Sequence, residues 1–452
     1  MNSKKMIEGN PLKLIIWFSL PLMLGNVFQQ LYTVVDTMIV GKILGVSSLA
    51  AVGSADWISW MAFGVITAFP QGFSILIAQA YGANDEKEVN KHLVSLVQCS
   101  ILVAIIFTAV GYLGLMPLLK LLNTPNEILL ESYAYVRVIY LGLPITMFYN
   151  ACASVLRAFG DSKTPLRAMV LAAIMNIGLD FVFILYFKMG VSGAALATVI
   201  AQGFATIYCF MILRRNPIIM TPFSLCSVDW VNNKKMFEIG FPMAFQNLLI
   251  AVGGIVLTGI INGYGTLFIA GFTAVNKMYG LLEIAAVSYG YAMVTYVGQN
   301  YGAKLYMRIK EGVKSAAILG TITAIVITIL IQLFDQQILL LFISGEPHEV
   351  EIALSVGEKY LLGMSLPLFV LYLLHIYRSA LQGLSNTFIP MVSGFVELAC
   401  RLLCAICLPI FLQENGLYFV EPAAWIGAMI LLAFWYYKTE REILNTKKES
   451  IV

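Results

Sequence analysis

Residues 11–41 read PLKLIIWFSLPLMLGNVFQQLYTVVDTMIVG, and this stretch decides how the rest of the chain is interpreted. It is long and apolar enough to cross a lipid bilayer as a helix. It also contains a proline, Pro21, and a carboxylate, Asp36. A spanning helix tolerates an ionisable side chain only where it faces protein or water, so Asp36 is a candidate functional residue. The alternative is that Asp36 lies near a helix end in the headgroup region and has no such role.

The composition is that of a polytopic membrane protein. Of the 452 residues, 60% are hydrophobic and 12% are charged, and this charged fraction is about half that of a typical soluble domain. Apolar runs last about 20 residues, which suits spanning helices better than the strands of about 10 residues in transmembrane barrels. The first run is also too long for the core of a cleavable signal peptide. We therefore expect an all-α membrane protein that keeps its first span.

Twelve apolar segments separated by turn residues predict twelve transmembrane helices. The predicted spans are 12–38, 48–70, 93–115, 132–155, 166–187, 192–213, 237–261, 268–292, 313–334, 352–377, 389–411 and 422–438. Of the 28 Lys and Arg residues, 21 fall in segments that are cytoplasmic if the N-terminus is cytoplasmic. The positive-inside rule therefore predicts a multi-pass protein of the plasma (inner) membrane with both termini in the cytoplasm.

The second half of the chain repeats the first at a displacement of 220–225 residues. Three pairs of segments carry the repeat: 78–83 (AQAYGA) with 298–303 (GQNYGA), 20–21 (LP) with 241–242 (FP), and 156–165 (LRAFGDSKTP) with 381–390 (LQGLSNTFIP). Matches in register along half the chain indicate a duplication, so we expect two pseudo-symmetric bundles of six helices. Duplicated bundles are typical of transporters, with the substrate between the halves.

The repeat also predicts the domain organisation. We expect an N-terminal six-helix lobe at 1–213, a cytoplasmic inter-lobe linker at 214–236, a C-terminal six-helix lobe at 237–438 and a cytoplasmic tail at 439–452. No soluble domain interrupts the spans, so catalysis in a separate globular domain is not expected.

Three predicted helices of the N-terminal half bring polar groups to one depth. Asn176 and Asp180 are spaced i, i+4 in the fifth span and share a helix face. Asp36, Asp180 and Thr198 each lie roughly 8–10 Å below the outer end of their spans at 1.5 Å per residue. Two carboxylates, an amide and a hydroxyl suit a monovalent cation, and neighbouring carboxylates also suit a shared proton because they resist ionising together. The alternative is that Asp180 serves only helix packing.

Taken in order, these motifs resemble the multidrug and toxic compound extrusion (MATE) family. They are the proline-bearing first span ending in VVDTMIVG, the QAYGA and QNYGA pair, and LRAFGDSKTP with its echo, and they cover about 11–438. The resemblance implies an exporter of amphipathic organic cations, driven by H⁺ or Na⁺. It also implies that Asp36, Asn176, Asp180 and Thr198 form the cation site of DinF-like members, and that Pro21 is the hinge of the first helix.

The resemblance further implies a monomer in the lipid bilayer, with no enzymatic activity, no cofactor, no nucleic-acid partner and no metal beyond possible Na⁺. The second half departs from the first at the site positions. The repeat pairs Asp36 with Leu257, Asn176 with Arg401 and Asp180 with Ala405. The duplicate has lost the acids, so we expect the N-terminal half to carry the ion coupling.

Other polar residues in the spans are candidates for the substrate cavity: Gln30, Tyr149, Asn150, Gln246, Asn247, Tyr279, Glu283 and Tyr372. Glu283 is a carboxylate that would attract a cationic substrate, and the alternative is that it pairs with Lys277. Glu397 and Arg401, spaced i, i+4, predict an ion pair within one helix. We expect His375 and Arg378 to lie at the membrane interface.

Two other functions are weighed against efflux. A flippase of lipid-linked intermediates from the same superfamily would need a cavity rich in Arg and Lys, whereas the predicted spans hold few cationic residues, among them Arg137, Lys277 and Arg401. A membrane enzyme would need a catalytic motif at a membrane face, and the three histidines are scattered along the chain. The sequence therefore favours a cation-coupled multidrug antiporter, and it does not choose between H⁺ and Na⁺.

Overall fold

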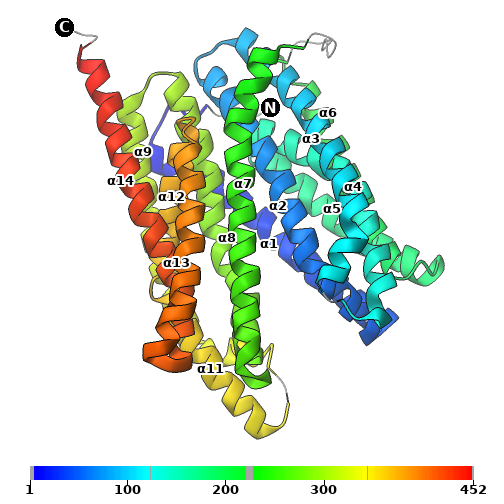
Figure 1. The fold of residues 1–452 in the computed structure, drawn as a ribbon. Helices are drawn as coiled ribbons and strands as arrows, with labels where there is room; N and C mark the ends of the chain where they lie inside the picture. Colours follow the sequence, from blue (N-terminus) through cyan, green and yellow to red (C-terminus); the bar gives the residue numbers. More distant parts are fainter. Residues whose placement is uncertain (1–4, 123, 220–227, 344, 450–452) are drawn as a thin grey trace. The chain divides into compact units, whose positions relative to one another are not determined.

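The computed structural model describes residues 5–122, 124–219, 228–343 and 345–449, and the regular structure in these ranges is helical (Figure 1). The elements are α1 (Pro11–Leu44), α2 (Val46–Gly82), α3 (Glu86–Leu121), α4 (Asn126–Ala158), α5 (Lys163–Phe181), η1 (Val182–Tyr186), α6 (Val191–Arg214), α7 (Trp230–Ile261), η2 (Asn262–Tyr264), α8 (Thr266–Gly302), α9 (Tyr306–Leu333), α10 (Asp335–Leu339), α11 (Pro347–Ser365), α12 (Leu368–Gly383), α13 (Phe388–Leu412), η3 (Gln413–Phe419) and α14 (Val420–Glu449).

Within the described residues, ten helices are long and apolar enough to cross a membrane, or eleven if the bent pair α11 and α12 forms one span. The bend between them is 44° and falls at Pro367, inside the predicted span 352–377. One candidate, Phe388–Asn445, takes in both α13 and α14, which the sequence divides into two predicted spans. The all-α membrane fold expected from the sequence is confirmed.

The chain forms two compact units. The first comprises Met1–Lys5 and Leu20–Ala244, and the second comprises Met6–Ser19 and Phe245–Val452. Helices α1 and α7 are each divided between the units, close to Pro21 and Pro242 respectively. The predicted lobe boundaries remain a prediction. Residues 220–227 of the predicted linker and 450–452 of the predicted tail lie outside the described residues.

In the first unit, α4 packs against α2, α3 and α6, and α5 packs against α6. The approach of α4 to α6 is close, because a Cβ at Gly142 would lie 2.3 Å from Val199 Cγ2. In the second unit, α12 packs against α8, α9 and α14, while α13 packs against α14 and α11 against α8. Each unit is therefore a helical bundle in which side chains from several helices are buried together.

The sequence repeat is also a repeat of local structure. Helix α2 ends at the first copy of the QAYGA-type motif and is followed by Asn84 with φ 58°, while α8 ends at the second copy and is followed by Lys304 with φ 57°. The other motif pair places Gly160 (φ 82°) and Ser385 (φ 63°) before α5 and α13. The two halves therefore turn the chain in the same way at equivalent positions, as expected of a duplication.

Candidate functional site

Asp36 lies on the part of α1 that belongs to the first unit, with an exposed fraction of 9%. Its neighbours Ile39 and Val40 are buried in an apolar cluster with residues of α2, η1 and α6. This cluster packs the last turns of α1 against the rest of the unit. The packing of α1 thereby fixes the carboxyl group inside the protein.

Helix α5 supplies Asn176 and Asp180, which are 1% and 0% exposed. The carboxyl groups of Asp36 and Asp180 lie within hydrogen-bonding reach of each other. Asn176 Nδ2 donates to Thr198 Oγ1 of α6 at 3.3 Å, and Thr198 Oγ1 donates to Ala194 O at 3.2 Å. The structure therefore brings together all four residues that the sequence proposes as cation ligands.

Most of the oxygens in this group lack a hydrogen-bond donor among the described residues. Asp36 Oδ1, Asn176 Oδ1 and both carboxylate oxygens of Asp180 are buried and accept no hydrogen bond from them. Burying an ionised carboxylate is very unfavourable unless a cation or donor compensates its charge. An oxygen-rich group of this kind can bind a hard monovalent cation or share a proton between its two carboxyl groups.

Three further residues extend the group, and the sequence reasoning missed them. Tyr32 lies one turn before Asp36 on α1, within electrostatic reach of that carboxyl group, and its side chain hydrogen-bonds to Gln202. Thr146 Oγ1 of α4 in turn donates to Gln202 Oε1 at 2.5 Å. Helical spacing could have identified two of them, because Tyr32 precedes Asp36 by four residues and Gln202 follows Thr198 by four, so each shares a helix face with a predicted ligand.

Pro21 lies inside α1, which continues as a helix from Pro11 to Leu44. Proline has no backbone N–H, so α1 lacks one helical hydrogen bond at this point. The boundary between the two compact units falls at Ser19 and Leu20, directly before this weakened turn.

The second unit carries buried ion pairs that differ from the predicted ones. The predicted pair of Glu397 with Arg401 is wrong, because Arg401 Nη2 binds Glu421 Oε2 of α14 at 2.7 Å, whereas Glu397 pairs with Arg378. Arg378 is buried, with 9% of its side chain exposed, and its predicted position at the membrane interface stays a prediction. Glu283 of α8 pairs with His375 of α12 at 3.2 Å. Tertiary packing, not spacing along one helix, therefore decides these partners.

The candidate cavity residues of the second unit are placed differently from one another. Gln246 is 2% exposed, and its side-chain oxygen can accept hydrogen bonds from Arg378 Nε at 2.7 Å and Nη1 at 3.3 Å. Tyr372 is fully buried and donates its hydroxyl proton to Leu282 O at 3.0 Å. Tyr279 is half-buried and stacks on Trp425, with ring centroids 5.9 Å apart. Asn247, also half-buried, follows Gln246 on α7.

In the first unit, the remaining candidates are Gln30, Tyr149 and Asn150. Gln30 is exposed on α1, six residues before Asp36. Tyr149 is 9% exposed on α4, and the neighbouring Asn150 donates Nδ2–H to Thr146 O at 2.9 Å. The role of these three residues in substrate binding remains a prediction.

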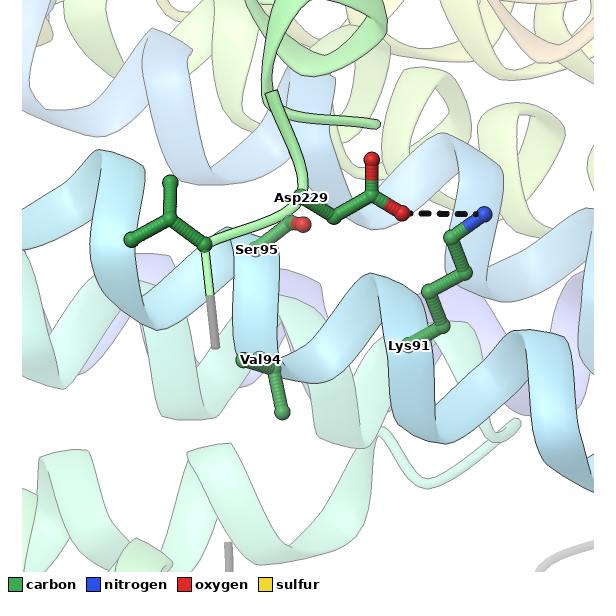
Figure 2. Close-up of a pocket in the computed structure, with 5 residues that line it drawn as sticks. Lys91, Val94, Ser95 and Asp229 are labelled. Carbon is green, nitrogen blue, oxygen red and sulfur yellow. Dashed lines mark ion pairs between the residues drawn. The ribbon is translucent and has the colours of Figure 1, made fainter. Parts of the chain in front are cut away.

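A separate pocket of the first unit lies at the start of α7 and is lined by Lys91, Val94, Ser95, Val228 and Asp229 (Figure 2). Lys91 Nζ binds Asp229 Oδ2 at 3.2 Å. The backbone N–H of Asn232 and the nearby Lys91 ammonium lower the pKa of the Asp229 carboxyl group. The pocket contains none of the predicted site residues, so we interpret its ion pair as fastening the start of α7 to α3.

Comparisons with known proteins agree on the family. The MatE family model matches residues 21–182 and 242–406, and the second match begins 221 residues after the first, which is the displacement that pairs Pro21 with Pro242. The chain is 30% identical to the probable multidrug resistance protein YpnP of Bacillus subtilis, over 80% of each protein. It is 28% identical to the probable multidrug resistance protein NorM of Thermotoga maritima, covering 93% of this chain and 90% of that protein.

Solved structures share the fold at lower identity. A crystal structure of MATE in complex with MaL6 superimposes with a TM-score of 0.90 at 20% identity, covering 98% of this chain and 100% of that one. The repeated family match and the identity to YpnP extend over most of the chain. The chain therefore belongs to the MatE family, whose members are transporters and not enzymes.

Proposed function

We propose that this multi-pass membrane protein is a multidrug efflux antiporter that exports amphipathic organic cations in exchange for H⁺ or Na⁺. The observation that carries the proposal is the buried oxygen group of the first unit, in which Asp36, Asn176 and Asp180 present four oxygens that accept no hydrogen bond from the described residues. The substrate class rests on the relatives, which are described as probable multidrug resistance proteins.

The chain's own residues can account for ion coupling. Two buried carboxylates at hydrogen-bonding distance cannot both stay ionised without a compensating charge. A proton shared by Asp36 and Asp180, or a Na⁺ ion held by them with the Asn176 and Thr198 oxygens, would supply that charge. Binding of the ion therefore favours the state in which these side chains are buried, and release of the ion favours a state in which water reaches them.

The helix that carries Asp36 also contains the proposed hinge. Pro21 weakens α1 beside the point where the helix passes from one compact unit into the other. A bend at this turn would reorient the part of α1 that carries Asp36, and Asp36 would move relative to α5 once the apolar cluster around Ile39 and Val40 opens. We therefore assign Pro21 the role of letting α1 yield during the transport cycle.

The pairing of the buried arginines argues against the flippase alternative. A flippase needs unpaired cationic side chains to bind a pyrophosphate, whereas Arg378 and Arg401 are each neutralised by a glutamate of the second unit. An ion-paired arginine has little residual charge to attract an anion. Organic cations are therefore the better match to the charge balance of the described spans.

A gradient experiment tests the proposal. Purified protein is reconstituted into liposomes, and transport of ethidium is followed by fluorescence under an imposed pH gradient and, separately, under an imposed Na⁺ gradient. We expect one of the two gradients to drive ethidium against its concentration gradient. If neither gradient drives transport and protein-free vesicles give the same trace, the antiport proposal is wrong.

A further inference from the structure

Besides the more exposed pair of Lys310 with Glu440, three ion pairs join helices of the second unit among the described residues, and one of the three differs from the other two. Arg378–Glu397 and Arg401–Glu421 each join a carboxylate to a guanidinium, which stays charged at every pH that a cell meets. The third joins His375 Nε2 of α12 to Glu283 Oε1 of α8 at 3.2 Å. Histidine is charged only when it carries a second proton.

The negative charge of Glu283 is therefore balanced only while His375 carries its second proton. When His375 is protonated, the pair is neutral overall. When His375 is neutral, its ring can still donate one hydrogen bond, but the negative charge of Glu283 is unbalanced. Glu283 is also the most exposed of the six partners, with 31% of its side chain accessible. A cation from outside the protein can therefore replace the proton as the partner of this carboxylate.

Aromatic rings lie near the pair, and the arginines described on α12 and α13 already have glutamate partners. Tyr279 lies one turn before Glu283 on α8, and Tyr372 lies three residues before His375 on α12; both are within electrostatic reach of Glu283. An aromatic ring beside a carboxylate suits an organic cation, because the ring face attracts positive charge. Tyr279 is the more accessible of the two rings, since Tyr372 is fully buried.

Other titratable groups on the elements packed against α8 and α12 are accounted for. Arg378 of α12, Glu397 and Arg401 of α13 and Glu421 of α14 are used in two permanent pairs. At the first turns of α9, Lys310 binds Glu440 at 3.2 Å and Arg308 donates to Asn300 Oδ1. The other described titratable side chains on these elements are Lys277, Tyr289, Tyr291, Tyr296, Tyr301, Tyr306, Glu311, Lys314, His348, Glu349, Glu351, Glu358, Lys359, Tyr360, Tyr377, Cys400, Cys404, Cys407, Tyr436, Tyr437, Lys438, Arg441 and Glu442. Of the ion pairs in the described chain, only the one with His375 involves Glu283.

We propose that Glu283 and His375 form a proton-switched binding site for a monovalent organic cation, with Tyr279 as its aromatic wall. In the proton-bound state, imidazolium Nε2–H pairs with the Glu283 carboxylate. Loss of that proton to solvent leaves a neutral ring and a free carboxylate, which then binds the organic cation. Proton and cation compete for one carboxylate. The cargo class rests on the proposed function, but this competition is an equilibrium at a site distinct from Asp36 and Asp180.

Equilibrium binding tests the site separately from ion coupling. Full-length protein carrying Asp36→Asn and Asp180→Asn is purified in detergent, so that titration in the first unit is removed. Ethidium, whose charge does not change with pH, is titrated in by fluorescence polarisation between pH 5.5 and 8.5. We expect its Kd to rise towards the acid end of this range, by up to about tenfold per pH unit, because each bound proton displaces one cation.

Further substitutions in the Asp36→Asn, Asp180→Asn protein test the roles of His375 and Glu283 separately. His375→Gln keeps a hydrogen-bond donor but cannot become charged, so the Kd should become independent of pH between 6 and 8. Glu283→Gln should weaken ethidium binding about tenfold or more at pH 8.5, where the proton competes least, and should remove the pH dependence. Glu283→Asp keeps the charge and should retain the competition, which provides a second test if the amide variant fails to fold. Glu351→Gln makes the same charge change at an exposed position of α11 and should leave the binding curve unchanged.

The outcomes separate this site from the antiport proposal. A pH slope that survives in His375→Gln, or an affinity that survives in Glu283→Gln, overturns the proton-switched site and leaves ion coupling by the first unit untouched. If the wild-type protein shows no gradient-driven transport but the proton still competes with ethidium for binding, the antiport proposal is wrong and the proton-switched site is supported.

Discussion

The positions that the repeat makes equivalent are buried in both units but carry different chemistry: Asp36, Asn176 and Asp180 in the first unit, against Leu257, Arg401 and Ala405 in the second. At these positions the first unit buries the carboxylates of Asp36 and Asp180, which form no ion pair with any described residue. The second has replaced both acids by apolar residues and has introduced an arginine that pairs with Glu421. The same arrangement of helices therefore holds two acids that need an added ion in the first unit, and an arginine with its own glutamate partner in the second.

The two versions are also matched in volume. In the first unit, α1 contributes the large Tyr32 near the site and α5 contributes the smaller Asn176. In the second unit, the equivalent of Tyr32 is Gly253 on α7, and a Cβ there would lie 2.2 Å from Arg401 Nη1. A bulky group on the first helix of one repeat is therefore exchanged for a bulky group on the fifth helix of the other, which preserves close packing.

The largest expected effect comes from removing the two acidic side chains of the first unit, which have no equivalent in the second. Asp36→Asn and Asp180→Asn keep the shape of each side chain but prevent ionisation, so each variant should reduce gradient-driven ethidium transport in proteoliposomes to the level of protein-free vesicles. The buried amides should leave the thermal unfolding midpoint close to the wild-type value. Asp335→Asn, on α10 of the second unit, is the matched control and should transport normally. Normal transport by both buried variants would show that the first unit does not couple the ion.

Removing the arginine of the second unit should affect stability rather than coupling. Arg401→Met leaves Glu421 buried without its partner, and breaking a buried pair in this way costs about 3–5 kcal/mol. Thermal unfolding in detergent should therefore begin at a clearly lower temperature.

The double variant Arg401→Met with Glu421→Gln should recover part of that loss, because no uncompensated charge remains. If the double variant is as unstable as the sum of the two single changes, the pair contributes no coupling energy. In that case the counter-charge interpretation of the second unit fails.

The volume exchange can be tested at Gly253. Gly253→Ala places a methyl group against the Arg401 guanidinium and should destabilise the protein by about 1–3 kcal/mol, as overpacking of a core does. Gly259→Ala on the same helix meets nothing within 4 Å and should change stability by no more than about 1 kcal/mol, on the stabilising side. Equal unfolding midpoints for the two alanine variants would remove the proposed steric link between α7 and Arg401.

Sequence reasoning predicted the features that depend on distance along the chain. Long apolar runs predict spanning helices, a constant displacement predicts the duplication, and the i, i+4 spacing of Asn176 and Asp180 predicts that these side chains face the same way. Depth within each span then predicted that Asp36 and Thr198 would lie near them. These inferences succeeded because helix geometry converts sequence spacing into position.

The ion pairs of the second unit depend on which helices contact one another. The spacing of residues along the sequence does not predict these contacts. Arg401 has Glu397 one turn earlier on its own helix, yet it binds Glu421 across the contact between α13 and α14. His375 and Glu283 are 92 residues apart. A long side chain can reach partners on several neighbouring helices, so the choice among them is made by packing that the linear pattern does not contain.

The smallest expected effect concerns the start of the two helices that cross between the units. Helix α1 begins after Asn10, whose Oδ1 accepts a hydrogen bond from Lys13 N, and α7 begins after Asp229, whose Oδ1 accepts one from Asn232 N. Both residues act as N-caps. Only the cap of α7 is charged, and it is the one that binds Lys91 on α3 (Figure 2).

Asp229→Asn should keep the cap and lose the ion pair, whereas Asp229→Ala should lose both. The pKa of Asp229 is lowered in the folded protein, so its contribution to stability is present above the unfolded value of about 3.9 and is lost as the pH falls through the lower folded value. Unfolding midpoints measured between pH 3 and 7 should therefore fall slightly less towards acid in Asp229→Asn than in the wild type. The alanine variant should be the less stable of the two at neutral pH. If the asparagine and alanine variants unfold at the same temperature there, the cap contributes nothing, and the attachment of α7 to α3 depends on the charge of Asp229 alone.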